Sequence, residues 1–313
     1  MDIPRKATLT QHITRQARTG WLLLAGFLMG SADVVPGVSG GTVAFLLGIY
    51  DELLEAIHTS SAAGVKVLSL RLREGLRAIP WMFLLPLGAG ILLAIFSLAR
   101  LLSWLIENHP TLVWSFFFGL VLASSLVVAR RLGRWEPRHF GLALAFAAGI
   151  YWLIGQVPLQ TPHTAPMFLL SGALAVTAMI LPGISGAFIL VLLGKYAAVL
   201  DAVVNFDFFT LALIAVGALI GLLSLARVLR WLLLNYRAAT TAALVGLMLG
   251  SLRKLWPWKA GGASTEEHAL VAEVNVLPAV VDAEVLLAIG LAGAACLLVL
   301  GLEQIARRRT AAA

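Results

Sequence analysis

Long apolar runs separated by short arginine-rich segments dominate this sequence. The longest runs cover about residues 80–106 and 208–233, and an α-helix needs about 20 apolar residues to cross a bilayer. Of the 313 residues 60% are hydrophobic and 12% are charged, whereas a soluble domain carries about 25% charged residues. The chain is therefore predicted to be an all-α polytopic membrane protein. This composition excludes an ordinary soluble enzyme, a disordered chain and a nucleic-acid-binding module.

The apolar runs form two similar sets, residues 20–157 and 166–306, between a basic N-terminus (1–19) and a basic tail (307–313). Each set opens with two short runs around a polar Pro-Gly break, which predicts a re-entrant helical hairpin, and continues with three transmembrane spans. The first set comprises the hairpin 20–57, a basic interfacial segment 64–79 and the spans 80–106, 112–129 and 140–157. The second comprises the hairpin 166–203, the spans 208–233, 238–249 and 285–305, and an outer polar loop 253–284.

Basic residues are concentrated on one side of these spans. With the N-terminus inside and each hairpin returning to its own side, 18 of the 23 Lys and Arg residues lie in inside segments. Because cytoplasmic segments carry such an excess, both termini are predicted to be cytoplasmic. Segment 64–79 is expected to lie on the membrane surface and to attract anionic lipids. The charge bias fits two full crossings as well as a re-entrant hairpin, and only the short runs and polar break favour re-entry.

The two sets are related in sequence. Residues 26–57 and 172–203 are identical at 13 of 32 positions, and residues 97–108 and 224–235 at eight of 12. Because each set contains one hairpin and three spans, an odd number, the second copy is expected to lie upside down relative to the first. Inverted repeats are typical of secondary transporters, whose site lies between the repeats near the bilayer midplane. A duplication kept for helix packing alone is the alternative, but packing does not explain a repeated Pro-Gly-x-Ser-Gly break.

The breaks predict an anion site. Pro36, Gly37, Pro182 and Gly183 are expected to form the hairpin turns, after which a new helix begins with free N–H groups inside the membrane. A helix N-terminus carries about half a positive charge, so an anion is a natural partner. The predicted phosphate-binding residues at the two new helices are Ser39, Gly40, Gly41, Thr42, Ser185 and Gly186.

Two repeated arginines and one unrepeated aspartate complete the predicted site. Arg100 and Arg227 occupy equivalent positions and would supply the charge that two helix termini lack against a phosphate monoester. For Arg227, extension to the nearby cytoplasmic surface is an equal alternative. Asp33 has Met179 as its counterpart, which suggests a coupling or gating role; capping of the first turn is the alternative.

The two breaks resemble the motifs of a known family. Residues 32–42 with Gly48 and Tyr50, and residues 178–186 with Gly194 and Tyr196, are similar to those of the polyprenyl-phosphate transporter family, formerly a domain of unknown function. The second motif departs at Ala187, where a small hydroxyl residue is expected. The resemblance implies a flippase that moves undecaprenyl phosphate from the outer to the inner leaflet of the bacterial plasma membrane. The carrier lipid would then be reused for cell-envelope synthesis.

The same residues also fit other functions. An ion-coupled transporter of a small anion would use the same hairpins, and protons and sodium ions are the candidate coupling ions of either transporter. The six histidines lie in or near loops and form no catalytic or metal-ligating constellation, and a single cysteine, Cys296, excludes a cysteine-based metal cluster. The chain is therefore expected to be no enzyme and to need no metal or cofactor.

Overall fold

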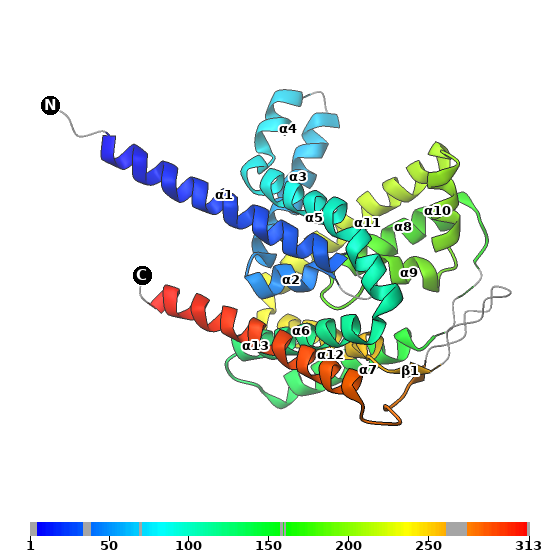
Figure 1. Cartoon of the computed structure of the whole chain (residues 1–313). Helices are drawn as coiled ribbons and strands as arrows, with labels where there is room; N and C mark the ends of the chain where they lie inside the picture. Colours follow the sequence, from blue (N-terminus) through cyan, green and yellow to red (C-terminus); the bar gives the residue numbers. More distant parts are fainter. Residues whose placement is uncertain are drawn as a thin grey trace.

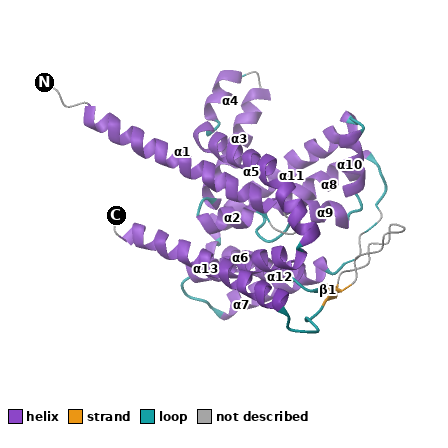
Figure 2. Cartoon of the chain, in the orientation of Figure 1, coloured by secondary structure: helices purple, strands orange, loops and turns teal. Residues whose placement is uncertain are grey.

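The computed structural model describes residues 5–33, 39–68, 71–156, 159, 161–260 and 274–311, which are almost entirely helical (Figures 1 and 2). Two short strands pair antiparallel within the expected outer loop. The prediction of an all-α chain is confirmed. In chain order the elements are α1 (Arg5–Asp33), α2 (Gly40–Leu47), α3 (Tyr50–Leu68), α4 (Leu72–Ala78), α5 (Trp81–Asn108), α6 (Pro110–Arg131), α7 (Pro137–Ile154), α8 (Ala165–Ile180), α9 (Gly186–Leu192), α10 (Tyr196–Val204), α11 (Phe208–Asn235), α12 (Arg237–Leu255), β1 (Lys259–Ala260), β2 (Val274–Asn275) and α13 (Ala283–Ala311).

Four helices of the described chain are long and apolar enough to cross a membrane, namely α5, α6, α11 and α13. Helices α9 and α10 would together make a fifth span, but the chain bends by 107° between them. Helices α7 and α12 stand where two further spans are expected, and both carry arginine within the helix. The multi-pass membrane class predicted from the sequence is therefore supported by the structure.

The long helices form two layers (Figure 1). One layer contains α6, α7, α12 and α13, where α13 packs along α6, α7 packs along α12, and α6 meets α12. In the other layer α1 packs along α5, and α8 packs along α11. The short helices α2 and α9, which follow the two breaks, lie between these groups.

Glycines bring the paired helices into backbone contact. At six of the described glycines a Cβ atom would lie only 1.9–2.2 Å from a carbonyl oxygen of the neighbouring helix. Small residues are enriched at such interfaces in membranes, because lipid offers no hydrophobic drive and close packing must supply the attraction. The six approaches are Gly26 to Leu87, Gly90 to Leu23, Gly119 to Ala292, Gly172 to Ile214, Gly217 to Leu169 and Gly246 to Ala143.

Large apolar side chains cover the outer surface of the spans. Phe96 on α5, Leu144 on α7, Phe208 on α11 and Leu297 on α13 are each more than two-thirds exposed. A soluble monomer rarely exposes so much contiguous apolar surface, whereas lipid tails provide a matching environment for it.

Several expected boundaries differ from the structure. Helix α1 begins at Arg5 and α13 continues to Ala311, so both run into the segments 1–19 and 307–313 that were expected to be separate basic termini. The sequence predicts that the span 238–249 ends before an outer loop at 253–284, but α12 continues to Leu255 and includes Arg253 and Lys254 in its last turn. Basic side chains interact favourably with the negative end of the helix dipole, so they prolong this helix rather than end it.

Carboxylates on the first two turns of α3 connect three other helices. Asp51 pairs with Arg237 of α12 at 3.2 Å. Glu52 forms an ion pair with Arg18 of α1, and Glu55 forms one with Arg230 of α11. We call these three pairs the α3 ion cluster. The predicted orientation places it on the cytoplasmic side, and the sequence analysis did not identify it.

Candidate functional site

The first break is closed by Ser39, which precedes α2. Its extended backbone (φ −120°, ψ 131°) makes it the N-cap, and its hydroxyl accepts a hydrogen bond from Gly41 N at 3.1 Å. The same hydroxyl donates to the carbonyl oxygen of Met179 at 2.8 Å. Ser39 is fully buried, so both bonds form away from water. A residue predicted to bind phosphate thus joins the two hairpins.

The second break receives two more side chains from the first hairpin. The hydroxyl of Thr42 accepts a hydrogen bond from Gly183 N at 2.9 Å, and Tyr50 donates from its hydroxyl to the carbonyl oxygen of Ile180 at 3.0 Å. Gly183 has φ +95°, a conformation open mainly to glycine. Backbone groups that the broken helix leaves without an intrahelical partner are therefore satisfied by α2 and α3, as a membrane interior requires.

An acidic side chain occupies the N-terminus of α2. The Oδ1 atom of Asp33, the last residue of α1, accepts a hydrogen bond from Gly40 N at 2.7 Å. A Cβ atom at Gly40 would lie 2.5 Å from Asp33 Oδ2, so only glycine admits the carboxylate in this position. Because a negative group is stabilised at a helix N-terminus, the protein itself supplies the anion there in this conformation.

A cavity of about 290 Å³ lies beside this carboxylate. It is lined by Asp33 of α1, by Ser185 and Gly186 at the start of α9, and by apolar residues of α8, α9 and α11. Ser185 is more than nine-tenths buried. Within the part of the chain that the structure describes, its hydroxyl forms no hydrogen bond, and it does not cap α9. The cavity therefore offers an anion a free hydroxyl donor.

The two hairpins are not in equivalent states. Ser39 and Ser185 correspond in the repeat, yet only Ser39 bonds across to the other hairpin. Tyr50 and Tyr196 also correspond, but Tyr50 is 2% exposed and bonded, while Tyr196 is 42% exposed. In the hydrogen bonds described between the hairpins, the first hairpin thus supplies the side chains and the second supplies backbone groups.

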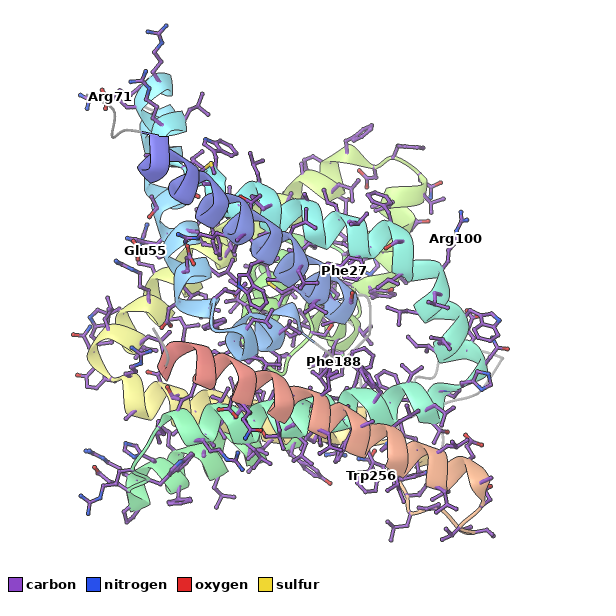
Figure 3. All side chains as sticks on the ribbon, turned by 60° about the vertical axis from the view of Figure 1, so that its left-hand side comes forward. Phe27, Glu55, Arg71, Arg100, Phe188 and Trp256 are labelled. Atoms are coloured by element: carbon purple, nitrogen blue, oxygen red, sulfur yellow. The ribbon has the colours of Figure 1, made fainter. Side chains whose placement is uncertain are left out.

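The predicted site residues fall into two groups. The structure brings together Ser39, Gly40, Gly41 and Thr42 with the second break, which includes Pro182, Gly183, Ser185 and Gly186. It does not bring Arg100 or Arg227 to them. Both arginines are exposed, and Arg100 projects outward from α5 (Figure 3). Pro36 and Gly37 lie outside the described residues.

Polar backbone groups that form the contacts between the hairpins could not be predicted from the sequence. Met179 and Ile180 are acceptors because their helix stops, and no side-chain pattern marks them. Among the described residues no group of three or more His, Cys, Asp or Glu could hold a metal ion.

Replacing Tyr50 by phenylalanine is expected to destabilise the folded protein by about 1 kcal/mol, the usual net contribution of a hydrogen bond. The ring contact with Phe45, at 4.9 Å between centroids, would be kept. Thermal unfolding in detergent measures the change, and Tyr196→Phe is the matched control. Equal melting temperatures for the two variants would contradict the structural asymmetry of the hairpins.

Comparison with known proteins agrees with the motif resemblance. Residues 29–272 match the family model "VCA0040-like: Undecaprenyl phosphate translocase-like". The chain is 44% identical over 299 residues to a protein of Vibrio cholerae serotype O1 named polyprenyl-phosphate transporter, which covers 91% of this chain and 96% of that protein. It is 30% identical over 259 residues to a protein of the same name from Staphylococcus aureus, covering 76% of this chain and 86% of that one. No solved structure matches the chain significantly. This chain therefore belongs to the undecaprenyl phosphate translocase-like family, a family of membrane transport proteins and not of enzymes.

Proposed function

We propose that this protein moves undecaprenyl phosphate, or a related polyprenyl phosphate, from the outer to the inner leaflet of the bacterial plasma membrane. This step returns the lipid carrier to the side where envelope polymers are started. The observation that carries the proposal is the cavity at the broken helices, which is lined by the buried Ser185 and by the carboxylate of Asp33. The names of the relatives support the substrate. A charged phosphate needs such a polar path, since its transfer into hydrocarbon is costly.

The proposed architecture is a pair of inverted repeats with cytoplasmic termini. The helix pairs support it, because α1 with α5 corresponds to α8 with α11, and α6 with α13 corresponds to α12 with α7. An inverted pair can exchange conformations between its halves, which gives alternating access around a fixed site.

In this mechanism the phosphate binds first to the hydroxyl of Ser185 and the start of α9. Asp33 then acts as the gate, since its carboxylate must leave Gly40 N before the phosphate can bond to the N-terminus of α2. In the opposite state the contacts of Ser39 and Thr42 across the hairpins would open, and these residues with Gly41 would face the headgroup. Protons or sodium ions would couple the cycle through Asp33.

Arg100 and Arg227 have a separate role in the proposal. Both are exposed in this conformation. Each is assigned a contact with the phosphate that forms only when the site opens toward its own face of the membrane. Anionic membrane lipids would interact with the basic surface at residues 71–78 of the interfacial segment.

Leaflet exchange of a fluorescent polyprenyl phosphate in proteoliposomes tests the function. Wild type should exchange the lipid rapidly, and Ser39→Ala and Ser185→Ala should each slow the exchange roughly tenfold or more, because each removes a hydrogen bond to a charged group. Arg100→Ala should also slow it. Ser124→Ala is the matched control, since among the described residues this buried hydroxyl bonds only to Leu120 O of its own helix.

Either of two results would overturn the proposal. One is full exchange by well-folded Ser39→Ala, Ser185→Ala and Arg100→Ala variants. The other is the absence of lipid exchange by the wild type, with and without imposed ion gradients, together with uptake of a water-soluble anion.

A further inference from the structure

A second cavity lies at the far end of α12 from the α3 ion cluster. Its volume is about 390 Å³, and it contains one charged side chain, Arg253. A cavity lined by Arg131 and Arg237 lies at the start of α12. Helix α12 has 19 residues and is about 28 Å long, close to the hydrocarbon thickness of about 30 Å. In the proposed topology α12 crosses the bilayer, which places the two cavities on opposite sides and the Arg253 cavity on the outer side.

The guanidinium of Arg253 is held in a fixed position. Its Cζ atom lies 4.4 Å from the ring centroid of Tyr151, and Nη1 donates to the carbonyl oxygen of Tyr151 at 2.7 Å. At Gly155 a Cβ atom would lie 2.4 Å from both terminal nitrogens, so a larger residue would displace them. Within the described residues, that carbonyl is the only hydrogen-bond acceptor of the guanidinium. Since arginine has five N–H donors, most of them remain available to a ligand.

Apolar and aromatic side chains surround this charge. Trp256 also lines the cavity. Its indole N–H already donates to Val276 O at 2.8 Å, so the ring offers a ligand mainly apolar surface. Asn275 donates to Arg253 O at 2.9 Å and so fixes the end of α12 to the outer loop. Figure 3 shows Trp256 at the lower edge of the molecule. The remaining lining is largely apolar, from Phe118, Leu249, Leu252, Val276 and Leu277.

We propose that the Arg253 cavity captures the phosphate-monoester headgroup of a polyprenyl lipid from the outer leaflet before the lipid reaches the hairpin cavity. This inference rests on the proposed function. A guanidinium matches phosphate geometry and bonds it through two donors at once. The aromatic and leucine side chains of the cavity can contact the first isoprene units of the lipid tail. A free phosphate ion has no such units, and a diacyl lipid has a polar glycerol in their place. The ligand is therefore an amphiphile with a dianionic head.

The test measures the rate of leaflet exchange against the mole fraction of polyprenyl phosphate in the donor membrane. Arg253→Gln should raise the half-saturating mole fraction about tenfold and change the maximal rate less than twofold, because it removes charge-assisted hydrogen bonds at capture only. Gly155→Ala should also raise the half-saturating mole fraction, because the added methyl group displaces the guanidinium while the charge of Arg253 is kept. Arg253→Lys should have a half-saturating mole fraction close to that of Arg253→Gln, since an ammonium lacks the planar arrangement of donors that bonds a phosphate through two N–H groups at once. Lys254→Gln, which removes the neighbouring charge, should match wild type.

The outcomes separate this inference from the function itself. If wild type exchanges the lipid and both Arg253→Gln and Gly155→Ala, shown to be folded by size-exclusion chromatography, keep its half-saturation, the capture site is wrong and the transport function stands. If wild type exchanges no lipid, the transport function is wrong and the inference falls with it. If inorganic phosphate or phosphatidylglycerol competes at Arg253 as well as the polyprenyl lipid does, the site is a general anion site and the inference is overturned.

Discussion

Replacing Asp33 by asparagine is expected to lower the half-saturating mole fraction of polyprenyl phosphate and the maximal exchange rate together, each by about tenfold. The carboxylate holds Gly40 N at 2.7 Å, in the place where the phosphate must bind in the proposed cycle. A hydrogen bond to a charged group contributes about 1.5–3 kcal/mol and a neutral one about 0.5–1.5 kcal/mol. The amide would therefore compete less with the incoming phosphate and would expel it more slowly. The same assay of rate against lipid mole fraction measures both parameters.

Asp282→Asn is the matched control for this variant. Asp282 also accepts a hydrogen bond from the first turn of a helix, from Val285 N at 2.9 Å, but it lies far along the chain at the start of α13 and does not line the hairpin cavity. A rise in half-saturation on replacing Asp33, with Asp282→Asn unchanged, would show that the carboxylate assists binding and would refute the competition.

Gly119→Ala is expected to cause a large loss of stability. A Cβ atom at this position would lie 2.1 Å from the carbonyl oxygen of Ala292, a backbone atom that can move only with the whole of α13. Overpacking of this kind costs about 1–3 kcal/mol or more even in adaptable cores. We expect a melting temperature lower by several degrees and a smaller yield of monodisperse protein.

Gly290→Ala provides the opposite case. No atom lies within 4 Å of a Cβ built at Gly290, so the change adds only the helix propensity of alanine, about 1 kcal/mol better than glycine. The two variants make the same chemical change on facing helices, and the structure predicts opposite signs. Equal melting temperatures would mean that α6 and α13 do not approach as closely as described.

The sequence identified the broken helices because proline, glycine and serine at a break have local physical consequences. Ser39 and Thr42 could be selected in this way. Their partners Met179 O and Gly183 N could not, since these are backbone groups about 140 residues away whose availability depends on where another helix stops. The unequal engagement of the two hairpins was equally hidden, because a repeat in sequence predicts equivalence.

The arginines show a second limit of the sequence. Repetition favoured Arg100 and Arg227, but apolar periodicity in a lipid-facing helix does not tell which residues turn toward the protein, and both lie exposed. Arg253 appeared to belong to a loop, because basic residues commonly flank a span. The position of its guanidinium depends on the ring of Tyr151 and on the absence of a side chain at Gly155. Both residues lie next to the guanidinium only in the folded chain.

The α3 ion cluster has a consequence for how easily the molecule changes shape. Its pairs connect α3 to α1, α11 and α12, and all of the paired side chains are at least one-third exposed. Each exposed pair contributes about 0–1 kcal/mol and is weakened by salt, so each is comparable with the thermal energy of about 0.6 kcal/mol. The three ion pairs of the α3 ion cluster can separate one at a time instead of together. In the proposed orientation these pairs join the helices on the cytoplasmic side, and we expect higher ionic strength to make their separation easier.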